Sequence, residues 1–194
     1  MYRLITGNRN YSSWSLRPWV LMKALDIPFE DQFVSFGKLD NHDDFRLFSP
    51  TGKVPLLIDD NRQVWDSLAI MLYLADRHEG VLPSDPDARA WVQAVSAEMH
   101  SGFAALRNDC TMNVGARVRR HSDSPALVRD IARIAEIFEE GLTRFGGPFL
   151  SGRGFTVADA FFAPVAYRIR TYAIEVGPLG TAWVERILAI PAML

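Results

Sequence analysis

A group of serines near the start of the chain lies between a predicted strand and a predicted helix. Residues 10–19 read NYSSWSLRPW, and Ser12, Ser13 and Ser15 carry the hydroxyl groups. Serine at the start of a helix accepts hydrogen bonds from the free amides there, and the same amides and the helix dipole attract anions. The segment therefore predicts either a helix cap or a site for a negatively charged group.

Two later stretches offer the same kind of chemistry. Pro55 stands near the start of a predicted strand, where its missing amide proton is tolerated. If its peptide bond is cis, the backbone of Val54 is free to pair with an extended ligand. Asp66 and Ser67 begin a strongly apolar helix. They are either simple caps or the groups that hold a carboxylate.

A small mixed sheet is expected to position these three stretches. Residues 2–6 alternate as a strand, residues 16–27 have apolar side chains at helical spacing, and residues 29–35 form a second strand. Such a strand–helix–strand unit pairs its strands in parallel. Residues 53–59 and 63–65 then form an antiparallel hairpin. The N-terminal part is thus an α/β domain with four strands.

From residue 88 onward every strong pattern is helical. Thr156-Val157-Ala158-Asp159 is typical of a capping box at the start of a buried helix. We therefore expect a domain at 1–79, a proline-containing linker at 80–87 and an all-helical domain at 88–194. The expected helices cover residues 88–108, 125–142, 160–172 and 182–189.

The composition excludes several classes of function. The 194 residues include 21 Lys and Arg against 23 Asp and Glu, which argues against nucleic acid or an anionic membrane as partner. The single cysteine, Cys110, is expected to be packed and inert, with no disulfide, metal or redox role. The basic run at 117–121 is expected to be solvated. With no signal peptide or membrane span in the pattern, we expect a cytoplasmic protein.

Taken together, these pieces resemble the cytosolic glutathione transferase family over essentially the whole chain. The segment 12–17, SSWSLR, looks like the serine motif of its zeta-like branch, and Lys53-Val54-Pro55 looks like the loop before its cis-proline. Asp66-Ser67 is similar to its acid–serine pair, and residues 156–159 are similar to its capping box. The resemblance implies a thioredoxin-like βαβ-ββα domain followed by a helical bundle.

The resemblance also implies a ligand and a role for each motif. Ser12 would hydrogen-bond the sulfur of glutathione, with Ser13 beside it. A free thiol has a pKa of about 8.5, and a hydrogen bond plus a helix N-terminus can lower it by about one to two units. The remaining binding residues implied are Val54 and Pro55 for the cysteinyl part, Asp66 and Ser67 for the γ-glutamyl end, and Lys53 for the glycine carboxylate. His42 is either a second group for that carboxylate or an ordinary loop histidine.

The sequence departs from the zeta-like pattern at Trp14, where the motif normally has cysteine, so sulfur exchange chemistry at that position is excluded. Isomerases of that branch use an arginine of the central helix for acidic substrates, and Arg168 and Arg170 lie near that place. Maleylacetoacetate-type isomerisation is therefore one alternative.

The expected function is conjugation, in which the thiolate of glutathione attacks a small, hydrophobic electrophile between the two domains. Its pocket walls are expected from Tyr11, Trp14 and the long helix with Met99, Phe103 and Leu106. A second alternative is a non-catalytic glutathione-binding or interaction protein of the same fold. No metal is expected, and two-fold dimers are expected from the family.

Overall fold

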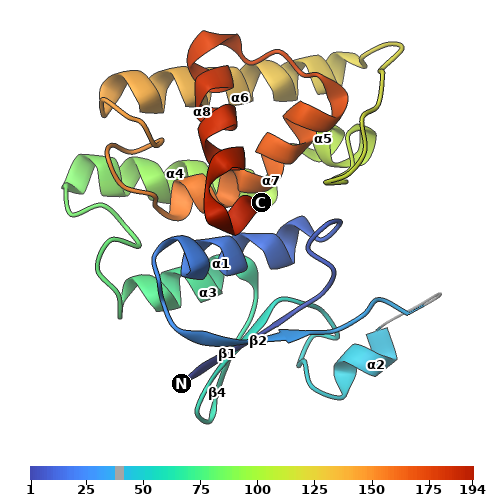
Figure 1. The fold of residues 1–194 in the computed structure, drawn as a ribbon, viewed down its shortest axis with the longest axis vertical. Helices are drawn as coiled ribbons and strands as arrows, with labels where there is room; N and C mark the ends of the chain where they lie inside the picture. The colour runs from blue at the N-terminus through green and yellow to red at the C-terminus, as the bar shows by residue number, and fades with distance from the viewer. Residues whose placement is uncertain (38–41) are drawn as a thin grey trace.

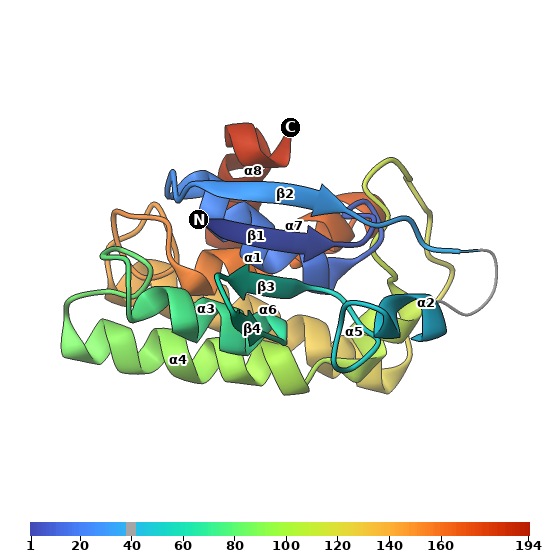
Figure 2. The same cartoon turned by 90° about the horizontal axis from the view of Figure 1, so that it is seen from below.

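The computed structural model describes residues 1–37 and 42–194. Its N-terminal part is built on a four-stranded sheet with the order β2-β1-β3-β4 (Figures 1 and 2). The β1 and β2 strands are parallel, whereas β3 is antiparallel to both β1 and β4. The strands are β1 (Tyr2–Thr6), β2 (Phe29–Phe33), β3 (Leu56–Asp59) and β4 (Arg62–Val64). The expected mixed sheet is confirmed.

Two helices cover the face of the sheet that is turned toward the rest of the chain (Figure 1). They are α1 (Ser13–Ala24) and α3 (Ser67–Ala75), and a short helix, α2 (His42–Arg46), lies at the end of the sheet. The α1 helix buries Leu16, Val20 and Leu21, whose spacing places them on one helical face. The N-terminal part therefore presents helices, rather than strands, to the second part.

The second part is helical, as predicted, and its central helix is α7 (Val157–Tyr172). This helix is apolar nearly all round because α1, α4 and α8 all pack against it (Figure 1). One continuous apolar core joins the two parts. The other helices are α4 (Pro86–Ser101), α5 (Ala104–Asp109), α6 (Pro125–Arg144), α8 (Gly177–Ala189) and a final 3-10 turn at Pro191–Met193.

The predicted capping box at the start of α7 is confirmed. The fully buried Asp159 carboxylate accepts hydrogen bonds from the Thr156 amide at 3.0 Å and the Thr156 hydroxyl at 3.2 Å. It also accepts from the Leu150 amide and from Nε1 of Trp183, both at 2.9 Å. Burial raises the pKa of Asp159, and these four hydrogen bonds oppose that shift. Asp159 therefore joins α7, α8 and the loop before α7.

The predicted single helix at 88–108 is wrong, because the chain breaks between α4 and α5. Gly102 is extended, and Phe103 has a left-handed φ of 60°. A Cβ on Gly102 would lie 2.9 Å from the carbonyl oxygen of Glu98, so the break requires glycine. The side chain of Arg107 closes the open end by donating to the carbonyls of Gly102, at 3.0 Å, and Met99.

Other element ends also differ from the prediction. The β3 strand begins at Leu56 rather than at residue 53, because its pairing with β1 begins there, opposite Ile5. The preceding Val54–Pro55 peptide is cis. The α8 helix begins at Gly177, five residues before the predicted start. Cys110 is buried, and the basic run lies in the loop between α5 and α6. Across the described residues, every helix is too short or too polar to cross a bilayer.

Candidate functional site

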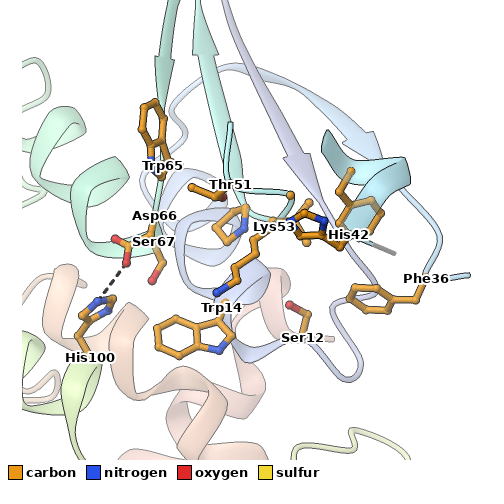
Figure 3. Close-up of a pocket in the computed structure, with 14 residues that line it drawn as sticks. Ser12, Trp14, Phe36, His42, Thr51, Lys53, Trp65, Asp66, Ser67 and His100 are labelled. Carbon is orange, nitrogen blue, oxygen red and sulfur yellow. Dashed lines mark ion pairs between the residues drawn. The ribbon is translucent and has the colours of Figure 1, made fainter. Parts of the chain in front are cut away.

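A cavity of about 810 Å³ lies where α1, the loop before β3 and the start of α3 meet α4 (Figure 3). Six of the seven residues predicted to act on or bind glutathione line it, and so does His42. The six are Ser12, Lys53, Val54, Pro55, Asp66 and Ser67. Segments that are more than fifty residues apart in the sequence thus meet at one cavity. Ser13 is the exception, because it lines a separate cavity of about 380 Å³.

Ser12 is the N-cap of α1. Its Oγ accepts the amide of Ser15 at 3.2 Å, and its hydroxyl donates to Oγ of Ser15 at 3.0 Å. Oγ of Ser15 also accepts the amide of Gly7 at 3.1 Å. The capping alternative is therefore realised. The cap does not remove Ser12 from the site, because Ser12 still lines both the larger and the smaller cavity.

The loop before β3 presents an unpaired stretch of backbone to the cavity. The hydroxyl of Ser49 donates to the carbonyl of Lys53 at 2.7 Å and accepts its amide at 3.3 Å, which fixes the loop. The next residue, Val54, precedes the cis bond to Pro55. Within the described residues, neither backbone group of Val54 makes a hydrogen bond. Both groups are thus available to a strand-like ligand.

Asp66 and Ser67 form the opposite wall of the cavity (Figure 3). Oδ1 of Asp66 caps α3 by accepting the amides of Leu68, at 3.0 Å, and Ala69, at 3.3 Å. Oδ2 of Asp66 lies 3.0 Å from Nε2 of His100. Oγ of Ser67 is buried and has no hydrogen-bond partner among the described residues. A ligand carboxylate would give that hydroxyl the partner it lacks.

Sequence reasoning missed two side chains next to the predicted ones. His100, from α4, reaches Asp66 and packs edge-on against Trp14, with ring centroids 5.3 Å apart. Arg17 is 1% exposed, and its guanidinium stacks 4.5 Å from the ring centres of both Trp14 and Phe161. Helical spacing could have indicated Arg17, because it shares the buried face of α1 with Val20 and Leu21.

The second cavity lies on the other side of Trp14, which lines both cavities. Its lining includes Tyr11, as predicted, together with Arg107 and Arg168. The prediction that Met99, Phe103 and Leu106 form cavity walls is wrong. They are 2–7% exposed and belong to the core, where α4 packs against α7 and α5 against α6. Arg170, the other arginine of the central helix considered from the sequence, donates to the carbonyl of Val114.

Sequence models of one family match both parts of the chain. A model described as glutathione S-transferase, N-terminal domain, matches residues 11–77, and one described as glutathione S-transferase, C-terminal domain, matches residues 90–191. The chain is 25% identical over 190 residues to a probable maleylacetoacetate isomerase from Caenorhabditis elegans, covering 96% of this chain and 88% of that protein. It is 29% identical over 190 residues to glutathione S-transferase F14 from Arabidopsis thaliana, covering 89% and 73%.

Solved structures show the same fold. A glutathione transferase homologue from Burkholderia, with bound glutathione, superposes with a TM-score of 0.73 at 22% identity, covering 99% of this chain and 94% of that one. Ure2p in complex with glutathione also gives a TM-score of 0.73, at 20% identity, covering 99% and 96%. The arrangement of a small mixed sheet followed by a helical part is therefore common to these proteins.

Proposed function

The chain belongs to the glutathione S-transferase family, and we propose that it is a glutathione transferase in which Ser12 stabilises the thiolate that attacks a small electrophile. The observation that carries the proposal is the meeting of Ser12, the free backbone of Val54 and the unpartnered hydroxyl of Ser67 at one cavity. These groups could bind the sulfur, the backbone and a terminal carboxylate of a tripeptide thiol, respectively.

Capping and catalysis are compatible at Ser12. Its oxygen accepts the amide of Ser15, while its proton points to Oγ of Ser15. Rotation about the Cβ–Oγ bond turns the proton toward a sulfur and keeps the oxygen where it is. The helix cap is therefore retained while the hydroxyl donates to the thiolate.

The other assignments follow the same ligand. Asp66 and Ser67 take the γ-glutamyl end, Val54 and Pro55 the cysteinyl part, and Lys53, with His42 as a second group, the glycine carboxylate. Ser13 is assigned only a supporting place in the first turn of α1, since it lines the other cavity. We further propose the boundaries 1–79, 80–87 and 88–194, a two-fold dimer and a cytoplasmic location.

The test compares Ser12→Ala with the native protein and with Ser124→Ala. Ser124 caps α6 in the same way, accepting the amide of Leu127 at 3.1 Å, and it does not line the cavity. Each variant should lose about 1 kcal/mol of stability, whereas only Ser12→Ala should lose conjugation of glutathione to a generic aromatic electrophile. Thermal stabilisation by glutathione without turnover in the native protein would favour the non-catalytic alternative. If the native protein shows neither thermal stabilisation by glutathione nor turnover, the transferase proposal and the non-catalytic alternative are both refuted.

A second candidate function is cis–trans isomerisation of an acidic substrate. Arg107 and Arg168 line the smaller cavity, which Ser12 also lines, and their guanidinium groups suit a carboxylate. One of the relatives is named a probable maleylacetoacetate isomerase. Assays with maleylacetoacetate and with an uncharged aromatic electrophile separate the two functions, because only the first substrate needs the arginines for binding.

A further inference from the structure

Three arginines gather on one side of Trp14, and we call Arg17, Arg107 and Arg168 the arginine cluster. The guanidinium of Arg17 lies 4.5 Å from the Trp14 ring centre, and that of Arg107 lies 5.0 Å from it. Arg17 is 1% and Arg168 5% exposed. Within the described part of the chain, none of the three has a carboxylate within 4.0 Å, although other arginines do. The cluster is a concentration of positive charge without a paired anion.

The hydrogen bonds of the cluster explain its geometry but not its charge. Arg17 donates to the carbonyl of Met99 at 3.4 Å, Arg107 to those of Met99 and Gly102, and Arg168 to that of Cys110. These carbonyls stand at the C-terminal ends of α4 and α5. A helix end carries about half a negative charge, so two ends offset about one of three positive charges.

Nearby carboxylates are engaged elsewhere. Asp66 caps α3 and contacts His100, and Asp130 accepts the amide of Leu106 at 3.0 Å. Nε and Nη1 of Arg17 are buried and have no hydrogen-bond partner among the residues that the structure describes. A buried guanidinium with unsatisfied donors is costly, and burial together with the charges of Arg107 and Arg168 lowers the pKa of Arg17. Arginine is the most basic side chain, so the guanidinium still stays protonated at neutral pH. The cluster therefore produces a positive potential that the protein itself does not cancel.

That potential reaches the place where Ser12 would meet a sulfur atom. Arg107 and Arg168 line the same cavity as Ser12, and Arg17 lies behind the Trp14 ring that lines both cavities. At an effective dielectric constant of about 20, a unit charge about 10 Å away shifts a pKa by about one unit. Positive charge favours the anion, so each arginine lowers the pKa of a thiol bound there.

We propose that the arginine cluster holds glutathione as a thiolate, acting through its electrostatic potential alongside the hydrogen bond from Ser12. The proposal rests on the proposed function, because it assumes that glutathione places its sulfur at Ser12. The arginines are positioning residues in this role: they stabilise the charge on the sulfur without contacting it.

The experiment titrates the thiol of bound glutathione by the ultraviolet absorbance of the thiolate, at saturating glutathione. The proteins are the native chain, Arg17→Met, Arg107→Gln, Arg107→Lys and the control Arg129→Gln, which removes an exposed arginine of α6. We expect Arg17→Met and Arg107→Gln each to raise the thiol pKa by about one unit, a tenfold loss of thiolate below that pKa. Arg107→Lys, which keeps the positive charge, and Arg129→Gln should leave the thiol pKa of bound glutathione as low as in the native protein.

The outcomes separate this inference from the function on which it rests. If the native protein does not bind glutathione, both are overturned. If it binds glutathione and Arg107→Gln leaves the thiol pKa unchanged, only this inference is overturned, even if Arg17→Met fails to fold. A rise in KM for an acidic second substrate with no change in the thiol pKa would also overturn it, and would assign the arginines to substrate recognition.

Discussion

Replacing His100 with phenylalanine tests how Asp66, which is proposed to bind the γ-glutamyl end of glutathione, is held in place. Nε2 of His100 lies 3.0 Å from Oδ2 of Asp66, and the buried Nδ1 has no hydrogen-bond partner in the described part of the chain. The ring proton is therefore assigned to Nε2, which donates to Asp66. Burial lowers the pKa of His100, the charges of Arg17 and Arg107 lower it further, and Asp66 opposes them. A neutral His100 positions Asp66 without cancelling its charge, so that charge is left for the ligand's ammonium group.

The expected magnitude follows from this contact. A hydrogen bond to a charged group contributes about 1.5–3 kcal/mol. The side chain of Asp66 is 50% exposed and that of His100 is 25% exposed, so solvent reduces the contribution to about 1–2 kcal/mol. Phenylalanine retains the edge-on contacts with Trp14 and Phe161. We expect glutathione to bind about 5- to 30-fold more weakly to His100→Phe.

Calorimetric titration measures the effect with two ligands, glutathione and its analogue that lacks the α-amino group. His100→Phe should reduce the preference for glutathione over the analogue, because that preference depends on Asp66. The control is His78→Phe, which removes a histidine that contacts Tyr2, outside the cavity. An unchanged ratio of the two affinities in His100→Phe would refute the argument, since a purely structural loss would weaken both ligands equally.

Three further predictions concern ligand binding and folding. Ser67→Ala should weaken glutathione binding by about 1–3 kcal/mol in the same titration without lowering the melting temperature, because Oγ of Ser67 makes no hydrogen bond within residues 1–37 and 42–194. Asp159→Ala should cost about 4 kcal/mol or more in urea unfolding, because it leaves the buried donors of Leu150, Thr156 and Trp183 without their acceptor. Stability should fall on acidification through the window from pH about 6.5 down to the lowered pKa of His100, since the unfolded chain takes up the proton first, and melting curves of His100→Phe should lose that part of the pH dependence.

The parts of the fold that the sequence predicted are those determined by short stretches of chain. The alternation in residues 2–6 and the capping box at 156–159 each act within a few residues, and the structure confirms both. The break at Gly102 could not be predicted in this way. A glycine inside a helix costs only about 1 kcal/mol, so its presence alone does not predict a break. The carbonyls that the break exposes are bound by the side chain of Arg107, a contact that residue types and spacing do not show.

The same distinction applies to the site. The motifs at 12–17, 53–55 and 66–67 were visible because each is a compact run of residues, and all three reach one cavity. His100 and Arg107 were not visible, because each stands alone among helical residues, and their roles depend on where α4 ends and α5 begins. Arg17 lay inside a quoted motif, yet the sequence could not show that its guanidinium would be buried without an anion.

The two interpretations of the first serines, helix cap and anion site, are not exclusive. A cap uses the lone pairs of Ser12, whereas thiolate stabilisation uses its proton, so the same hydroxyl can serve both. Ser124 also uses both, since its oxygen accepts the amide of Leu127 and its hydroxyl donates to Oδ2 of Asp109 at 3.3 Å. The hydroxyl alone therefore cannot distinguish a catalytic serine from a structural one. The distinction lies in the surroundings. Ser12 shares a cavity with Arg107 and Arg168, which have no carboxylate within 4.0 Å among the described residues, and the same turn of helix supplies Trp14, which lines both cavities. On this argument, the proposed catalytic role of Ser12 depends on the contact between the two parts of the chain, and substitutions of the arginines in α5 or α7 should alter it as strongly as substitution of Arg17 in α1.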